Sequence, residues 1–169
     1  MKPFVTLLAI LAAGCSSGGH VTPQSSGSVH TLSARIVLPS RTMTAGSAIK
    51  ARLVVTNSTG RAIHALGCGT LFQVALTSNT YHPDVAWPLC LQHLTIPAGV
   101  TSYRITVNAT YLSCGQSQSA STTPACPLDG GMPPLPAGKY RAKLFQSRHV
   151  VQAPPGVPVR VIAAVPAGR

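Results

Sequence analysis

Cysteine is the residue type in this chain with the widest chemistry, because a thiol can act as a nucleophile, bind a metal or form a disulfide. The sequence contains five cysteines, at positions 15, 68, 90, 114 and 126. No two of them have the spacing of about two to four residues that is typical of zinc-binding pairs. The spacing therefore disfavours a metal site, and oxidation of these thiols would exclude a nucleophilic role.

The other polar side chains provide few elements of a catalytic site. The only two acidic residues, Asp84 and Asp129, lie in separate predicted loops, so paired carboxylates for acid–base catalysis are not expected. Nucleophile-elbow, zinc-protease and phosphate-loop motifs are missing from the sequence. The six histidines show no ligand spacing, and the His82-Pro83-Asp84 triplet is more typical of a turn than of a metal site. We therefore expect neither an enzyme nor a cofactor.

One predicted loop, at residues 78–88, contains four side chains that could form a contact surface. They are Tyr81, His82, Asp84 and Trp87. Aromatic side chains on a restrained loop supply contact area at low entropic cost. For Trp87, the only tryptophan, we favour the interpretation that it fills the hydrophobic core. We name the four residues as a candidate binding site and keep both interpretations of Trp87.

The charge of the chain is strongly unbalanced, with thirteen lysines and arginines against two acidic residues and a net charge of +11. Lys139, Arg141 and Lys143 alternate along one predicted strand and should face one side. This cluster predicts contact with anionic lipid or an anionic wall polymer, although the charge could instead serve only solubility. The other basic residues are scattered singly, which disfavours nucleic acid as the partner: Arg35, Arg41, Lys50, Arg52, Arg61, Arg104, Arg148 and Arg160.

The N-terminus has the features of an export signal. Lys2 supplies a positive charge, an apolar run follows at residues 4–13, and small residues precede Cys15. The apolar run is about half the length that a membrane-spanning helix needs. These features predict a signal peptide at residues 1–14.

The stretch Leu11-Ala12-Ala13-Gly14-Cys15 resembles the lipobox of bacterial lipoproteins, although Ala12 stands where leucine is commonest in that family. The resemblance implies cleavage before Cys15 and a diacyl lipid on its thiol. The protein would then be anchored in the cell membrane and face outside the cytoplasm. The Ser/Gly-rich residues 15–30 would form a flexible tether. An ordinary signal peptide with a chance cysteine is the alternative.

With Cys15 assigned to the lipid, the remaining cysteines form an even set in an oxidising compartment. Four cysteines allow three pairings. We favour Cys68–Cys90 and Cys114–Cys126, because each pair brackets a segment without strong strand character. Each closure would stabilise the domain by about 3 kcal/mol.

Alternating apolar and polar residues predict an all-β domain over residues 31–169. The clearest strand is at residues 48–57, where Ile49, Ala51 and Leu53 alternate with Lys50 and Arg52. A sandwich of the immunoglobulin type, with about seven or eight strands, is typical of such a pattern. The other predicted strands are at residues 31–38, 61–66, 70–77, 91–96, 101–111, 139–146 and 157–163.

Three turn and strand-end motifs resemble those of bacterial immunoglobulin-like modules: VVTNSTGR at residues 54–61, IPAG at 96–99 and LPAGKY at 135–140. Their order across residues 31–162 is similar to that of the intracellular proteinase inhibitor family. The export signal and the four additional cysteines depart from that family. Taken whole, the chain resembles lipoproteins of unknown function from high-GC Gram-positive bacteria, of the actinobacterial type.

These observations predict a non-enzymatic, lipid-anchored binding or scaffold module of the cell envelope. Its partner, an envelope protein that the sequence does not identify, would meet the loops at residues 81–87 and 113–134. The alternatives are an extracytoplasmic proteinase inhibitor, which would use a disulfide-held loop as a substrate mimic, and a carrier of a metal or small envelope ligand.

Overall fold

The computed structural model describes residues 32–88, 90, 92–115 and 124–165, and within these ranges the chain forms nine β-strands and no helix. The predicted all-β class is thereby confirmed. The predicted signal peptide (residues 1–14), the lipid-attachment residue Cys15 and the tether (residues 15–30) lie outside the described residues. Within the described ranges, no helix has the length and apolarity needed to cross a membrane.

Each of the eight predicted strands overlaps an observed one. The addition is a short strand, β2, between the predicted strands at residues 31–38 and 48–57, and it forms because it pairs in parallel with the last strand of the chain. The strands are β1 (Leu32–Val37), β2 (Thr42–Thr44), β3 (Ala48–Asn57), β4 (Ile63–Gly67), β5 (Phe72–Thr77), β6 (Gln92–Ile96), β7 (Gly99–Asn108), β8 (Gly138–Gln146) and β9 (Val157–Ile162).

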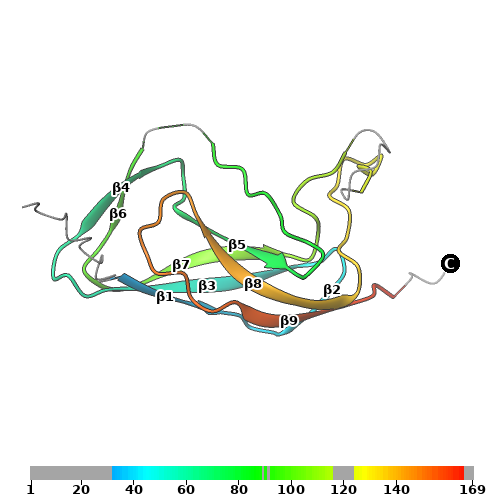
Figure 1. Ribbon diagram of the computed structural model, residues 1–169, viewed down its shortest axis with the longest axis horizontal. Coiled ribbons are helices and arrows are strands. Elements are labelled where there is room, and N and C mark those ends of the chain that lie inside the picture. The colour runs from blue at the N-terminus through cyan, green and yellow to red at the C-terminus, as the bar shows by residue number, and fades with distance from the viewer. Residues whose placement is uncertain (1–31, 89, 91, 116–123, 166–169) are drawn as a thin grey trace, which may run out of the picture.

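The strands form two principal sheets and one small one (Figure 1). One principal sheet has the order β1-β3-β7 and is antiparallel throughout. The other has the order β2-β9-β8-β5, and its β2–β9 pair is parallel. The β4–β6 pair forms the third sheet at one end of the molecule (Figure 1).

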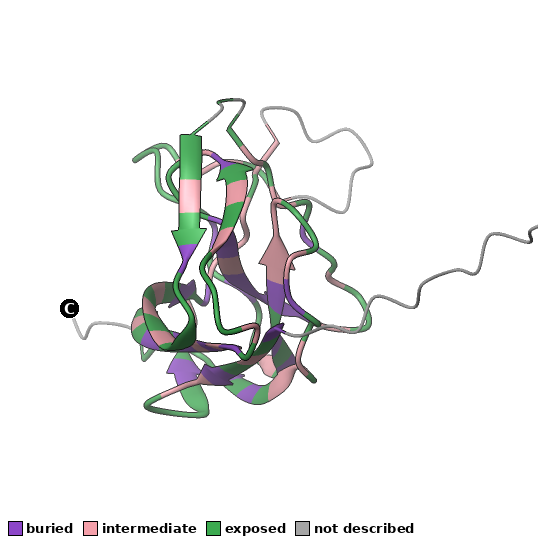
Figure 2. Cartoon of the chain, turned by 90° about the vertical axis from the view of Figure 1, so that its left-hand side faces the viewer, coloured by how far each residue is buried: buried purple, intermediate pink, exposed green. Residues whose placement is uncertain are grey.

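The two principal sheets share one hydrophobic core, which gives the domain a sandwich-like arrangement. Leu53 and Val55 of β3 are fully buried on one side of this core, and Ala142 and Val161 of β8 and β9 belong to the other side. Buried and exposed residues alternate along the strands (Figure 2), as expected when one face of each sheet packs inward and the other faces water. The core therefore fixes which side chains lie on the two outer faces.

Asn57, the last residue of β3, is buried despite its polar side chain and is only 1% exposed. Its Nδ2 donates to the carbonyl oxygens of Arg61, Ile96 and Pro97 at 2.8, 3.3 and 3.1 Å. Its Oδ1 accepts from the backbone N–H and the hydroxyl of Thr59 at 3.1 and 2.7 Å. Gly60, in the VVTNSTGR motif at residues 54–61, has the positive φ of 75° that a turn at this position requires. The side chain of Asn57 joins this turn to the end of β6.

The predicted sequential disulfide pairing is confirmed, with Cys68 bonded to Cys90 and Cys114 bonded to Cys126. The first bond joins the segment after β4 to the segment before β6. The second is supported by backbone hydrogen bonds from Gly115 to Pro124 and from Cys126 to Gly115. Both bonds therefore restrain irregular segments outside the two principal sheets.

Candidate functional site

The structure divides the four candidate residues of the 78–88 loop among different surroundings. The phenol oxygen of Tyr81 accepts a hydrogen bond from the backbone N–H of Leu112 at 2.9 Å, and its ring packs edge-on against Tyr111 at 4.9 Å. Asp84 is exposed. His82 and Trp87 line two different cavities. Tyr81 thus holds two loops together.

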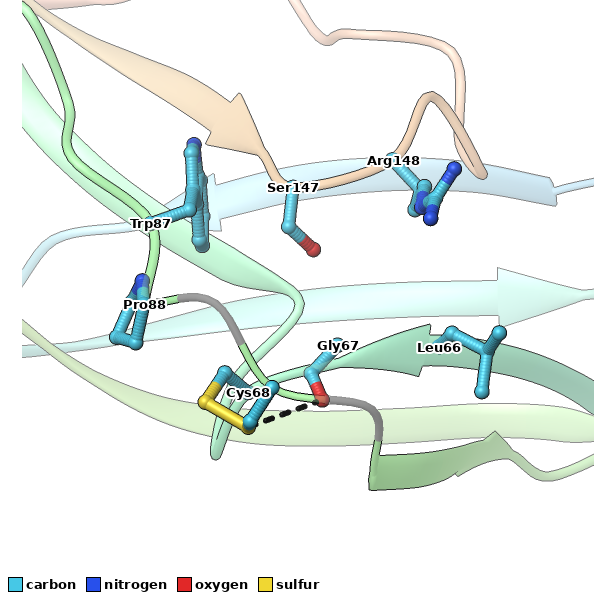
Figure 3. A pocket seen from close by; sticks show the side chains of 8 residues that line it. Leu66, Gly67, Cys68, Trp87, Pro88, Ser147 and Arg148 are labelled. Carbon is cyan, nitrogen blue, oxygen red and sulfur yellow. Dashed lines mark hydrogen bonds between the residues drawn. A yellow bond between two sulfur atoms is a disulfide. The ribbon is translucent and has the colours of Figure 1, made fainter.

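Trp87 is half-buried and lines a small pocket of about 370 Å³ beside the first disulfide. In Figure 3, Trp87 and Pro88 lie on one side of the pocket, and Ser147 and Arg148 come from the segment after β8. Trp87 is not among the residues that form the hydrophobic core. It is therefore a pocket-lining residue, and the favoured prediction that Trp87 fills the hydrophobic core is wrong.

A larger and more open cavity of about 970 Å³ lies over the outer face of the β2-β9-β8-β5 sheet. Five exposed cationic residues line it, and we call this surface the basic groove: Arg41, Lys139, Arg141, Lys143 and Arg160. Hydroxyl groups of Ser78 and Thr80 and the imidazole of His82 line the same groove. The 78–88 loop therefore contributes hydrogen-bonding groups to a surface whose charge comes from strands.

Strand register explains how the cations of the basic groove come together. Lys139, Arg141 and Lys143 alternate along β8 with the buried residues Tyr140, Ala142 and Leu144, so their predicted one-sided arrangement is confirmed. The pairing of β9 with β8 places Arg160 directly opposite Lys139.

Arg41 reaches the same groove because its carbonyl accepts a hydrogen bond from the backbone N–H of Arg160 at 2.7 Å. The sequence spacing indicates that Arg41 and Arg160 are isolated charges, and the structure shows that this prediction is wrong. They are far apart in the chain but line one groove, because β2 pairs with β9 and β9 pairs with β8.

The positive charge of the basic groove has no acidic counterpart among its lining residues. The chain has only two acidic residues, Asp84 and Asp129, and neither of them lines the groove. Like charges directly opposite each other on paired strands destabilise a sheet, and Lys139 and Arg160 form such a pair. An anion bound in the groove would remove this repulsion, so the arrangement suits anion binding.

Burial of three phenol groups makes the stability of the domain sensitive to alkaline pH. Burial raises the pKa of Tyr81, Tyr103 and Tyr140 above the ordinary value of 10.0. The folded state therefore retains the phenol protons to a higher pH than the unfolded state does. The stability that the protonated phenols contribute is intact below pH 10 and is lost as the pH rises through the folded-state pKa. We expect the thermal midpoint, followed by circular dichroism, to fall from pH 9 to about pH 11. A variant with all three tyrosines replaced by phenylalanine should show a smaller fall, and an equal fall would contradict this assignment.

No protein-family model matches the sequence, and a search of the curated proteins finds no match. Within the part of the chain that the structure describes, no three or more His, Cys, Asp or Glu side chains are grouped in a way that could hold a metal ion.

Proposed function

We propose that this protein is a non-enzymatic binding module of the cell envelope, held at the membrane by a lipid on Cys15, and that its basic groove binds an anionic polymer. The observation that carries the proposal is the convergence of five exposed cations from β8, β9 and the segment before β2 on one groove. A groove about 970 Å³ in volume suits a polymer chain better than the flat surface of a membrane.

The groups that line the basic groove suit phosphate-bearing polymers in particular. Arginine presents a planar fork that matches phosphate oxygens, and lysine adds a mobile point charge. The hydroxyl groups of Ser78 and Thr80 hydrogen-bond to each other at 3.3 Å, which leaves one of their two protons to donate to such oxygens. The same lining has no carboxylate for acid–base catalysis, because the two acidic residues of the chain lie elsewhere.

We also propose that the domain is an immunoglobulin-like sandwich. The orders β1-β3-β7 and β5-β8-β9 correspond to the A-B-E and C-F-G strands of that fold. The hydroxyl of Tyr140, near the start of β8, donates to the carbonyl of Pro136 at 2.9 Å. This bond resembles the tyrosine corner, which occurs at the start of the F strand in immunoglobulin-like domains.

Binding of long-chain inorganic polyphosphate to the full-length protein in a neutral detergent tests the groove. The variant Lys139→Gln/Lys143→Gln/Arg160→Gln removes three positive charges from it. We expect the dissociation constant to rise about 10- to 100-fold and its salt dependence to become shallower, since fewer counterions are released. Arg141 is left intact because its Nη2 donates to the carbonyl of Gly156 at 2.9 Å and supports the segment before β9.

The matched control is Arg35→Gln/Arg52→Gln/Arg104→Gln, which removes the same charge from exposed residues outside the groove. This variant should keep its affinity for polyphosphate within about threefold of the original protein. Equal losses in the two variants would mean that the polymer does not distinguish the groove from the other basic residues of the domain. In that case the groove would have no special role, and the charge would serve solubility.

A further inference from the structure

The protein has a second basic surface, on the outer face of the β1-β3-β7 sheet. We propose that this surface, formed by Arg35, Lys50, Arg52 and Arg104, docks on a lipid surface that carries anionic headgroups. The inference rests on the proposed function, because the lipid on Cys15 would bring the domain to the membrane. The proposal also gives the orientation of the domain at the membrane: one outer face rests on the lipid, and the opposite face carries the basic groove.

The strand register builds this docking face from residues that are scattered in the sequence. Arg52 of β3 lies directly opposite Arg104 of β7. Arg35 of β1 pairs with Val54, which is the next residue after Arg52 on the same face of β3. Lys50 pairs with Thr106, whose Oγ1 accepts a hydrogen bond from Lys50 Nζ at 3.1 Å. All four cations are exposed, because the alternate residues of β3 are buried in the core.

No acidic residue compensates these charges within the three strands. The Arg52–Arg104 pair places like charges directly opposite each other, an arrangement that destabilises a sheet when no anion is present. The other exposed side chains of the face include the hydroxyls of Ser33, Ser102 and Thr106, which can donate to headgroup oxygens. The docking face is therefore complementary in charge and hydrogen bonding to an anionic surface.

A lipid surface is favoured over a polymer by the place of this sheet in the chain. β1 begins at Leu32, about 17 residues after Cys15, and a flexible chain of that length spans on average only about 20–25 Å. The sheet that contains β1 is thus the one joined directly to the predicted lipid anchor. Basic residues held near an anionic leaflet are attracted to it additively.

The sandwich-like arrangement then determines which way the basic groove faces. The inward residues of both principal sheets belong to one core, so the outer faces of these sheets point in opposite directions. When the docking face rests on lipid, the basic groove is directed away from the membrane. A polymer could occupy the groove without displacing the domain from the lipid.

The lysines allow the two faces to be followed separately. The sequence has lysines only at positions 2, 50, 139 and 143, and Lys2 belongs to the predicted signal peptide. Lys50 therefore reports on the docking face, and Lys139 and Lys143 report on the basic groove.

The lipidated protein would be reconstituted on phosphatidylcholine vesicles with or without about one third phosphatidylglycerol and acetylated briefly. Mass spectrometry would then measure the acetylation of each lysine. We expect acetylation of Lys50 to fall at least about fivefold on the anionic vesicles, with Lys139 and Lys143 unchanged.

Two variants and a salt control complete the test. High salt should restore labelling of Lys50, because it screens the attraction. The variant Arg52→Gln/Arg104→Gln should also restore it, whereas the matched variant Arg41→Gln/Arg160→Gln, with changes on the opposite face, should retain the protection. Lys50 labelling that is equal on the two kinds of vesicle would overturn the proposal, as would protection of Lys139 and Lys143 by anionic lipid in its place.

A polymer at the docking face would be detected by the same labelling. Protection of Lys50 by polyphosphate on purely neutral vesicles would assign this face to a polymer and overturn its assignment to lipid. Failure of the protein to float with neutral vesicles would instead refute the lipid anchor, and with it both proposals about the membrane. Polyphosphate binding in the groove is measured independently, so its failure would leave the Lys50 result interpretable.

Discussion

Replacement of all four paired cysteines by alanine is expected to lower the free energy of unfolding by about 6 kcal/mol. The bonds Cys68–Cys90 and Cys114–Cys126 close segments with sequence separations of 22 and 12 residues. Each closure removes conformational freedom from the unfolded chain and stabilises the native state by about 3 kcal/mol. Since domains of this size are stable by only about 5–15 kcal/mol, the change should bring the protein close to unfolding at room temperature. Urea denaturation, followed by circular dichroism, measures the effect.

The two pairs can be separated by single-pair variants. Cys68→Ala/Cys90→Ala should cost slightly more stability than Cys114→Ala/Cys126→Ala, because its closed segment is longer. It should also alter the fluorescence of Trp87, whose pocket is lined by Cys68 and Cys90. A four-alanine variant with an unchanged urea midpoint would contradict a stabilising role for the bonds.

Replacement of Asn57 by alanine is expected to cost about 3 kcal/mol, the largest effect that we predict for a single substitution. The change removes the donors to the carbonyls of Arg61, Ile96 and Pro97, together with the acceptor for Thr59. A buried polar group without a partner costs about 1–3 kcal/mol, because it has lost water without gaining a hydrogen bond. Urea denaturation of the variant and the original protein gives the difference.

Asn108, at the end of β7, provides the matched control because it is an exposed asparagine at a strand end. Asn108→Ala should change the free energy of unfolding by less than about 0.5 kcal/mol. Similar costs for the two substitutions would show that the Asn57 hydrogen bonds contribute little. Both asparagines begin an Asn-X-Thr motif, but the burial of Asn57 leaves its side chain inaccessible to glycosylation in the folded domain.

The missed strand β2 and the underestimated role of Asn57 have a common physical reason. A three-residue strand is too short to show an alternating pattern, and β2 exists because Thr42–Thr44 can pair with β9. Asn57 is a typical turn residue by type, and only the approach of residues 96 and 97 gives its amide buried acceptors. Both features depend on partners that are distant in the chain.

The separation of the 78–88 loop residues has a similar origin. Sequence proximity predicts that Tyr81, His82, Asp84 and Trp87 share one surface, but an irregular segment has no fixed period that assigns its side chains to a face. Contacts with Tyr111 and Leu112 draw Tyr81 inward, whereas His82 lines the basic groove. Trp87 lines the pocket beside the first disulfide.

The sequence by itself determined the all-β class, the eight longer strands, the disulfide pairing and the common face of Lys139, Arg141 and Lys143. The strands and their common face follow from local alternation, because successive residues of a strand point to opposite faces wherever the strand lies. The disulfide pairing follows from the two segments without strand character that the cysteine pairs bracket. Only the tertiary structure decided that Arg41 and Arg160 complete the basic groove and that Arg52 lies opposite Arg104. Such neighbours depend on strand order and register, which are set by the packing of the whole core and not by spacing along the chain.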